Sequence, residues 1–494
     1  MRGRLAMRRR YLFPAILVGA SVIWSGFAGL ANSPAKQYEY LNALVVDDRY
    51  AFGTAWIKTD VPNIEKLSEI DEVLLVQLLE SFDNPVHEPT GRKLFLDQAE
   101  ADFQTRQCDS SKKRCELRFH LNRKIEPSYV HGDLRLIQAR ISSIVQEVSL
   151  SEEQVEFISR TEETRQLRFM FTDRGWVIRA AEVIAETPIA LRQARPLEID
   201  KMSGLNYYPR TAPWDKFWPA FPVDVIETDL DAVKALGANS VRIFLQHDYF
   251  SNLETQADGL ARLSHFLEMC KVRDIRVIVT MFDLRGDYRF QNWSRDSRLL
   301  STILDKIQDH PALLGIDLKN QPDLDFEGSN RLQVTAWLEA MILSARQSHA
   351  NVPLTIGWSD PKYAALLSDH LNFVSFHDYN NPEGLSARLA GVKAKVGDKP
   401  VFITEIGHSR WSPLGDKSKR QAERLSDQLD QIGKANGVFV WTLHDFDQIG
   451  SNIVGRRPWR KAQQKAFGIT QSDGSWRASA QAFHDFNQTF QSNP

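Results

Sequence analysis

The side chains best suited to do chemistry in this sequence lie where short apolar segments end. Asn320 and Gln321 follow "LLGIDLK", and Glu405 follows "PVFIT". A charge at the end of a buried strand must be accommodated by polar partners, and Arg242 and Tyr379 are the candidates to keep Glu405 ionised and oriented. A carboxylate held in this way can attack an electrophilic carbon. Gln321 carries an amide, which neither donates a proton to a leaving group nor takes one from water.

Eight apolar, β-branched segments must position these side chains. They read "GLNYY", "SVRIFLQ", "RVIVTMF", "LLGIDLK", "LTIGW", "FVSFHDY", "VFITEIG" and "GVFVWTLHDF". Amphipathic segments alternate with them, which favours an all-parallel sheet covered on both faces. Eight strands over residues 200–490 predict an α/β fold of the (β/α)8 barrel (TIM barrel) type. The alternative is a doubly wound open sheet, although no phosphate-binding glycine turn is present.

Three helical segments between the strands have readable limits. "TDLDAVKALGA" predicts a helix that opens with Thr228 as its cap and ends at Gly237. "RLQVTAWLEAMILSARQS" and "KSKRQAERLSDQLDQIGKAN" predict two further helices. In a barrel of this kind the chemistry lies at the C-terminal ends of the strands. We therefore expect one cavity to collect the strand-end residues Asn206, Tyr207, Tyr208, Arg242, Gln246, His247, Asp283, Asn320, Gln321, Trp358, His377, Tyr379, Glu405 and Trp441.

These strand ends resemble the retaining (β/α)8 glycoside hydrolases of clan A, most closely the cellulase- and mannanase-like family 5. The matching residues, in strand order, are Arg242, Asn320, His377 with Tyr379, Glu405 and Trp441. The resemblance implies a β-linked glycan or glycoside as ligand, with Glu405 as the nucleophile and the other residues binding substrate. Retaining enzymes use two carboxyl groups about 5–5.5 Å apart, and the fourth and seventh strands can supply such a pair across a barrel mouth.

Gln321 departs from the family pattern, which has the acid/base Glu at this position. One hypothesis is a degenerate hydrolase that binds glycan without turning it over. In a second, Asp323 or Asp325 swings in and supplies the proton; the alternative for both is a solvated loop. In a third, the substrate has a good leaving group, as the resemblance to plant myrosinases, which carry Gln there, implies. Gln321 stays a catalytic-site candidate in all three.

Aromatic side chains independently favour a sugar ligand. "NYYPRTAPWDKFWPAF", residues 206–221, places six aromatic residues directly after the first barrel strand. Flat rings offer large contact area at low entropic cost, although such rings also pack loops onto a barrel. We predict Tyr207, Trp214, Trp358 and Trp441 as sugar-binding residues.

The part before the barrel, residues 37–195, has a different pattern and predicts a smaller α+β domain. It opens with a helical pattern, "NIEKLSEIDEVLLVQLLESF", and continues with alternating segments typical of half-buried strands. "TDRG" predicts a hairpin turn between two of these strands. Nothing in this part indicates a chemistry, and a scaffold or interaction role is expected.

Residues 1–35 combine a basic start, "MRGRLAMRRR", with about twenty uncharged residues and small residues at the end. They predict either a signal peptide or an uncleaved N-terminal anchor in the inner membrane, so the rest would be extracytoplasmic, periplasmic or secreted. Cys108 and Cys115 bracket a polar segment suited to a disulfide in such a compartment. Cys270 is expected to be a buried free thiol.

The composition excludes some classes of protein. Of 494 residues, 43% are hydrophobic and 25% charged, and the formal net charge of −2 does not indicate nucleic-acid binding. No motif indicates a cofactor or a metal. The leading hypothesis is an exported protein that binds a β-linked glycan and hydrolyses it with retention only if the loss of the acid/base at Gln321 is compensated. The alternatives are a non-catalytic carbohydrate-binding component of an envelope polysaccharide system and a scaffold for protein contacts.

Overall fold

A computed structural model describes residues 106–109, 114–130, 136–151, 155–172, 175–188, 197, 199–288, 292–326 and 331–492. Eight parallel strands form a closed barrel, with β13 pairing back onto β6. The strands are β6 Met202–Asn206, β7 Ser240–Gln246, β8 Arg276–Asp283, β9 Leu313–Asn320, β10 Leu354–Trp358, β11 Val374–Asp378, β12 Val401–Ile406 and β13 Gly437–Val440. All eight predicted strands are confirmed, and the (β/α)8 barrel replaces the alternative of an open sheet.

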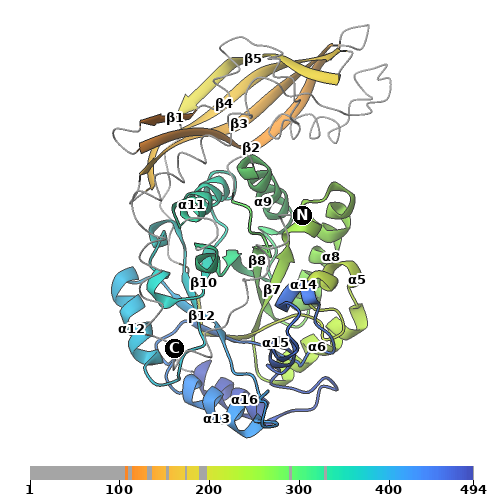
Figure 1. Cartoon of the computed structure of the whole chain (residues 1–494), viewed down its shortest axis with the longest axis vertical. Coiled ribbons are helices and arrows are strands. Elements are labelled where there is room, and N and C mark those ends of the chain that lie inside the picture. Colours follow the sequence, from red (N-terminus) through yellow and green to blue (C-terminus); the bar gives the residue numbers. More distant parts are fainter. Residues whose placement is uncertain are drawn as a thin grey trace.

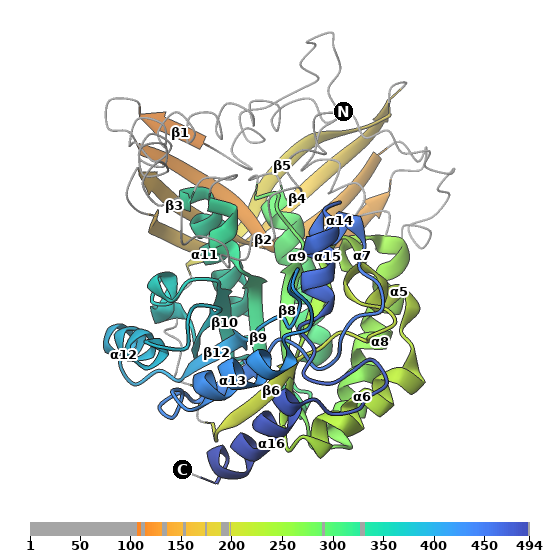
Figure 2. The ribbon, with the colours of Figure 1, turned by 60° about the horizontal axis from the view of Figure 1, so that its bottom comes forward.

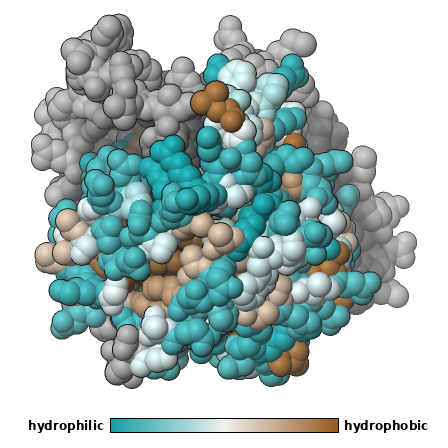
Figure 3. Space-filling view, turned by 90° about the horizontal axis from the view of Figure 1, so that it is seen from below, coloured by the Kyte–Doolittle hydropathy of each residue, from teal (hydrophilic) through white to brown (hydrophobic). Residues whose placement is uncertain are grey.

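Helices surround the barrel as an outer ring (Figure 1). They are α6 Val223–Ala235, α7 His247–Ser251, α8 Leu253–Lys271, α9 Trp293–Ile307, α11 Arg331–Ser348, α12 Leu385–Val396, α13 Ser418–Leu429 and α16 Ala478–Phe490. Nearly every barrel-strand residue is buried, because side chains on one face fill the barrel and those on the other face meet the helices. Seen from below, the surface is largely hydrophilic, with apolar side chains gathered in a few areas (Figure 3).

The helix predicted to open at Thr228 begins earlier. Pro222 precedes the first turn of α6, and Thr228 lies inside the helix, where its hydroxyl donates to the carbonyl of Asp224 at 2.8 Å. A threonine in a helix can return its hydroxyl to the preceding turn, so Thr228 is not a cap. The predicted end is confirmed, since Gly237 follows the helix with a φ of +73° that favours glycine.

A five-stranded antiparallel sheet precedes the barrel. Its strands pair in chain order: β1 Arg106–Asp109, β2 Arg114–Val130, β3 Leu136–Ser151, β4 Val155–Thr172 and β5 Gly175–Pro188. Thr172 pairs with Gly175, as expected for the hairpin at "TDRG". The sheet lies against α9 and α11 (Figures 1 and 2), on the outside of the barrel.

Several expectations for the N-terminal part fall outside the described residues, namely residues 1–35 and the helical pattern at 63–82. In the part of the chain that is described, none of the helices has the length and apolar character needed to cross a membrane. Cys108 and Cys115 are backbone partners across the β1–β2 ladder, and their disulfide stays a prediction. Cys270 is a buried free thiol, as predicted.

Short helices lie over the C-terminal ends of the strands. After β6 the chain forms the 3-10 turn η4 Trp214–Lys216 and α5 Phe217–Ala220. After β13 it forms α14 Ser451–Val454 and α15 Pro458–Lys465. Figure 1 shows α14 and α15 in dark blue inside the ring of outer helices, and Figure 2 shows them together at one end of the barrel.

Candidate active site

A pocket opens at the C-terminal ends of the barrel strands. Its empty space, part of which is open solvent, is about 390 Å³. The strand ends contribute Phe244, Asp283, Asn320, Gln321, Glu405 and Trp441. The loops and short helices above them contribute Tyr208, Trp214, Ile453, Val454 and Gln464.

Arg242, which is fully buried, is the centre of the polar network beneath the pocket. Its guanidinium donates to Asp317 Oδ2 at 3.1 and 2.6 Å, and to Glu405 Oε1 at 2.7 Å. It also donates to the amide oxygens of Asn206 and Asn320, each at 2.9 Å. A rigid fork that binds four groups at once can be supplied by arginine and not by lysine. Arg242 thereby holds Glu405 and Asn320 in place together.

Gly357 on β10 leaves room for this network. A Cβ atom at this position would lie 2.7 Å from Asp317 Oδ2 and 3.0 Å from Arg242 Nη2. Both atoms belong to a buried ion pair that cannot move aside without losing its partner. A side chain at residue 357 would therefore displace the arginine.

Glu405 is a buried carboxylate with both oxygens engaged. Oε1 accepts from Arg242, and Oε2 accepts from the hydroxyl of Tyr379 at 2.6 Å. Burial raises the pKa of Glu405, while Arg242 and Tyr379 act in the opposite direction. Burial and the adjacent carboxylate also raise the pKa of Tyr379 far above its usual value, so Tyr379 stays a donor. The pair holds Glu405 in one orientation, as a nucleophile requires.

His377 lies between Gln321 and Glu405. Its Nδ1 lies 2.9 Å from Gln321 Nε2 and 3.4 Å from Glu405 Oε2. The two distances add to 6.3 Å, which is the largest separation possible between those atoms of Gln321 and Glu405. Burial, together with the charge of Arg242, holds the pKa of His377 well below its usual value. His377 is therefore a neutral imidazole, and its Nδ1 can accept from Gln321 Nε2 and orient that amide without adding charge.

Gln321 has an unusual backbone for a residue with a side chain. Its φ and ψ are 49° and 51°, in the left-handed region, and its N–H donates to the carbonyl of Gly357 at 2.7 Å. Such a conformation is uncommon outside glycine and asparagine. The turn directs the Gln321 side chain at His377 and the pocket.

The structure holds Asp323 and Asp325 away from the pocket. Asp323 accepts from the backbone N–H of Ser359 at 2.8 Å and from its hydroxyl at 2.6 Å. Asp325 accepts from the hydroxyl of Tyr288 at 2.5 Å. Both carboxylates thus have structural partners, and the hypothesis that one of them replaces the missing acid is not supported. The alternative of a solvated loop is also wrong, because Asp325 is buried.

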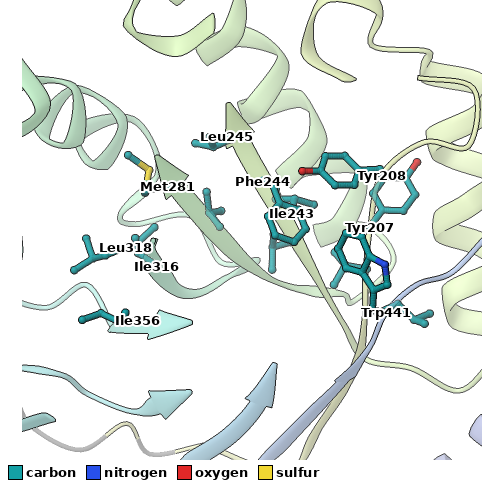
Figure 4. Close-up of a cluster of buried hydrophobic side chains, with 14 of the residues drawn as sticks. Tyr207, Tyr208, Ile243, Phe244, Leu245, Met281, Ile316, Leu318, Ile356 and Trp441 are labelled. Carbon is teal, nitrogen blue, oxygen red and sulfur yellow. The ribbon is translucent and has the colours of Figure 1, made fainter. Parts of the chain in front are cut away.

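Tyr207 was predicted to bind sugar, and this is wrong. Its hydroxyl donates to Asp229 at 3.0 Å and its ring stacks on Phe266 of α8, so it packs between the barrel and the helices. Tyr208 lines the pocket instead, and its hydroxyl donates to Asp283 at 3.0 Å. The two rings point in different directions (Figure 4), because consecutive residues of an extended chain face opposite sides.

Of the three predicted tryptophans, two lie at the pocket. Trp214 and Trp441 line it with ring centroids 6.2 Å apart. The indole nitrogen of Trp441 is buried and has no hydrogen-bond partner among the described residues, which leaves it available to a ligand oxygen. Trp358 does not line the pocket. It is fully buried and packs beside Phe326 and Tyr363.

Three further strand-end residues, Asp283, Gln246 and His247, have different roles. Asp283 lines the pocket, and burial raises its pKa despite Lys319 and Tyr208 nearby. Gln246 supports Tyr208 from below, 3.4 Å from its hydroxyl. His247 lies in α7, 3.5 Å from Asp296 and outside the pocket lining.

Two groups of site residues were not predicted from the sequence. Asp317 anchors Arg242 but lies in mid-strand, and its signal was a charge inside the apolar segment "LLGIDLK". Ile453, Val454 and Gln464 come from α14 and α15. They follow the last strand in a segment without catalytic residue types, so only the folded chain places them at the pocket.

Comparisons with known proteins agree with this geometry. Residues 210–447 match the family model Cellulase (glycosyl hydrolase family 5). A β-D-glucosidase of Triticum aestivum, 4-hydroxy-7-methoxy-3-oxo-3,4-dihydro-2H-1,4-benzoxazin-2-yl glucoside beta-D-glucosidase 1b, is 32% identical over 127 residues. That match covers 22% of this chain and 21% of the wheat protein.

Among solved structures, an exo-beta-1,4-mannosidase from Opitutaceae bacterium strain TAV5 superposes with a TM-score of 0.50 at 20% identity, over 61% of each chain. A GH5_18 protein from Streptomyces cattleya superposes with a TM-score of 0.48 at 18% identity, over 61% of this chain and 82% of that one. This chain thus spans about a fifth of the wheat relative and three fifths of the mannosidase. The family match over residues 210–447 and the closed eight-stranded barrel make this part of the chain similar to family 5 glycoside hydrolases in sequence and fold.

Proposed function

We propose that this protein binds a β-linked glycan or β-glycoside in the pocket and cleaves it with retention, with Glu405 as the nucleophile. One observation carries the proposal. Glu405 Oε2 and Gln321 Nε2 are at most 6.3 Å apart, and both face the same imidazole. Retaining glycosidases separate their two carboxyl groups by about 5–5.5 Å and inverting ones by about 6.5–9.5 Å. The observed limit supports the retaining arrangement.

In the proposed reaction, Glu405 forms a bond to the anomeric carbon while the bond to the glycosidic oxygen breaks. Water then cleaves the glycosyl–Glu405 ester, and the sugar leaves with its original anomeric configuration. Asn320 uses its amide oxygen to accept from Arg242, which leaves its NH2 group to donate to a sugar hydroxyl. Trp441 supplies a ring face and a free indole N–H.

Gln321 limits which substrates react. Its amide can hold the glycosidic oxygen through a hydrogen bond but cannot protonate it. General acid catalysis contributes about 10²–10⁴ in rate, so a sugar alkoxide leaves slowly while an acidic leaving group departs unaided. The substrate we propose therefore has a stable leaving group, or turnover on natural glycans is slow.

A second candidate function follows from the same residue. The amide of Gln321 favours a non-catalytic carbohydrate-binding component of an envelope polysaccharide system, in which the pocket holds a chain end. The names of the two relatives, a β-D-glucosidase and an exo-beta-1,4-mannosidase, support a β-linked gluco- or manno-configured ligand for either function. Export, with residues 1–35 as signal peptide or membrane anchor, is part of this proposal and is tested by cell fractionation with N-terminal sequencing.

The deciding experiment bypasses the missing acid. The full chain is incubated with 2-deoxy-2-fluoro-β-glucosyl and β-mannosyl compounds that carry a dinitrophenolate leaving group, and its intact mass is measured. We expect a covalent glycosyl adduct that peptide mapping places on Glu405, with no adduct on Glu405→Gln. Glycan binding without any adduct would favour the binding component. The absence of both would favour a scaffold for protein contacts.

A further inference from the structure

Beside the pocket lies a surface formed by residues 456–465, which we call the basic lip. Its ten residues include five cations and no acid: Arg456, Arg457, Arg460, Lys461 and Lys465. The chain as a whole carries 61 basic and 63 acidic residues, so this local excess of positive charge is not a property of the whole chain. A concentrated positive surface attracts anions.

Among the residues that the structure describes, the cations of the basic lip have no acidic partners. Some arginines elsewhere on this barrel are paired, as Arg273 is with Asp231 at 2.6 Å and Arg410 with Asp416 at 2.8 Å. Within the described ranges, none of the five lip cations forms an ion pair, and Lys461 donates to the hydroxyl of Ser451. Charges that are not used for internal pairing are available to a ligand.

The basic lip also carries an exposed aromatic ring. Trp459 is 48% exposed, and the guanidinium of Arg457 lies over its ring, 5.5 Å from the centroid. An exposed indole is a costly surface in water and an effective platform for a sugar ring. The ring and the cations are adjacent, so one sugar acid can contact both.

The lip is continuous with the pocket. Ile453 and Val454 of α14, directly before it, and Gln464 within it line the pocket. Figures 1 and 2 show α14 and α15 side by side at the same end of the barrel. A chain with one residue in the pocket therefore leaves it beside the lip. Acids also lie at this end of the barrel: Asp283 and Glu405 line the pocket, and Asp215 accepts from Asn452.

We propose that the basic lip binds the continuation of an acidic glycan, a β-linked polymer with carboxylate groups, whose end residue occupies the pocket. The inference rests on the proposed function, because it takes the pocket to be a glycan site. It adds the class of glycan: the carboxylates of successive sugar acids meet the lip cations, and one ring stacks on Trp459. Guanidinium–carboxylate contacts of this kind are among the stronger hydrogen bonds in proteins.

The test compares oligosaccharides that differ only in charge. β-1,4-Linked gluco- and manno-oligosaccharides are titrated into the full chain by calorimetry beside their C6-carboxylated counterparts, the β-1,4-glucuronate and β-1,4-mannuronate oligomers. We expect one acidic oligomer to bind about tenfold or more tightly than its neutral counterpart. Because the lip is exposed, the difference should shrink as ionic strength rises.

Two sets of variants locate the effect. Arg456→Gln, Arg457→Gln and Arg460→Gln together should abolish the preference for the acidic oligomer. The matched control Lys306→Gln, Lys395→Gln and Lys434→Gln removes the same charge from exposed positions near the other end of the barrel, and should keep the preference. Trp459→Ala should weaken binding of the acidic oligomer several-fold, while Trp476→Ala, at a comparably exposed tryptophan beside α16, should not. Thermal unfolding checks that each variant is folded.

Three results would overturn the inference: equal binding of acidic and neutral oligomers, a preference that persists in the triple arginine variant, and no binding of either acidic oligomer. Equally tight binding of a single-stranded DNA oligomer of the same charge would also overturn it, since the lip would then be a general polyanion surface. The covalent labelling of Glu405 by the fluoro-glycosides is measured in a separate experiment and tests only the catalytic proposal. If the chain prefers the acidic oligomer but Glu405 is not labelled, the inference about the lip stands and the catalytic proposal falls. If Glu405 is labelled but there is no preference for the acidic oligomer, the catalytic proposal stands and the inference about the lip falls.

Discussion

Tyr379 donates a hydrogen bond of 2.6 Å to the buried oxygen Oε2 of Glu405. The contact joins β12 to the residue that follows β11, and it opposes the effect of burial on the carboxylate. A hydrogen bond to a buried charged group contributes about 1.5–3 kcal/mol. Tyr379 is therefore positioned to set both the orientation and the ionisation of Glu405.

Replacing Tyr379 with phenylalanine tests this relationship. In Tyr379→Phe the pKa of Glu405 should rise further, so covalent labelling by the fluoro-glycosides should slow by about 10- to 100-fold near neutral pH. The loss should be smaller at higher pH, where the carboxylate ionises without help. The measurement is the labelling rate as a function of pH. A uniform loss at every pH would mean that Tyr379 only shapes the pocket.

Gln321→Glu should restore the missing acid. Hydrolysis of unactivated β-glycosides should rise by about 10²–10⁴, while kcat/KM on dinitrophenyl glycosides should change little because their leaving group needs no proton. The paired measurement on the two substrate types separates acid catalysis from binding. Equal gains on both would show that the substitution acts through affinity instead.

Trp441→Ala should weaken glycan binding by about 10- to 100-fold, since a ring lining the pocket is lost. The control is Trp358→Phe. Trp358 also lies at a strand end, but it packs against Phe326 and Tyr363 and does not line the pocket. Affinity measured by calorimetry should fall in the first variant and not in the second. Equal affinity losses would contradict the assignment of Trp441.

Asp317→Asn should destabilise the fold by about 1.5–3 kcal/mol, because the buried guanidinium of Arg242 loses one of its two carboxylate partners and keeps only Glu405. Asp231→Asn is the matched control: it removes the partner of Arg273 at the surface, where Asp231 is 68% exposed, and should cost less than about 1 kcal/mol. Denaturant unfolding measures both. Similar costs would show that the buried pair contributes no more than a surface pair.

Asp283 should make stability depend on pH. Burial raises its pKa in the folded state, so the folded protein binds this proton more tightly than the unfolded chain does. The associated stability is complete below the unfolded pKa and is lost as pH rises through the folded pKa. Asp283→Asn cannot ionise, so its melting temperature should exceed that of the native chain by a margin that grows from about pH 4 to pH 8.

Asp231→Asn, which removes one exposed carboxylate, serves as the control in the same pH series. A margin for Asp283→Asn that is constant across the series would contradict the assigned cause. In that case the carboxylate of Asp283 would be tolerated equally in both charge states.

The order of residue types along the chain was enough to predict the barrel and its strand-end polar set. Alternating apolar strands and amphipathic helices admit few architectures, and in a parallel barrel the strand ends must meet at one mouth. Arg242, Asn320, Gln321, His377, Tyr379, Glu405 and Trp441 come together for that reason.

The tertiary structure decided which faces those residues present. Tyr207 and Tyr208 are neighbours of the same type, and only the twist of the chain after β6 sends one to Asp229 and the other to the pocket. Trp358 and Trp441 both lie at strand ends, so the sequence could not distinguish them. In the structure Trp358 is buried away from the pocket, whereas Trp441 lines it. The position of the basic lip beside the pocket could not be predicted from the sequence, for a related reason. Its charges lie beyond the last strand, and only the return of α14 and α15 across the barrel mouth brings this segment beside the pocket.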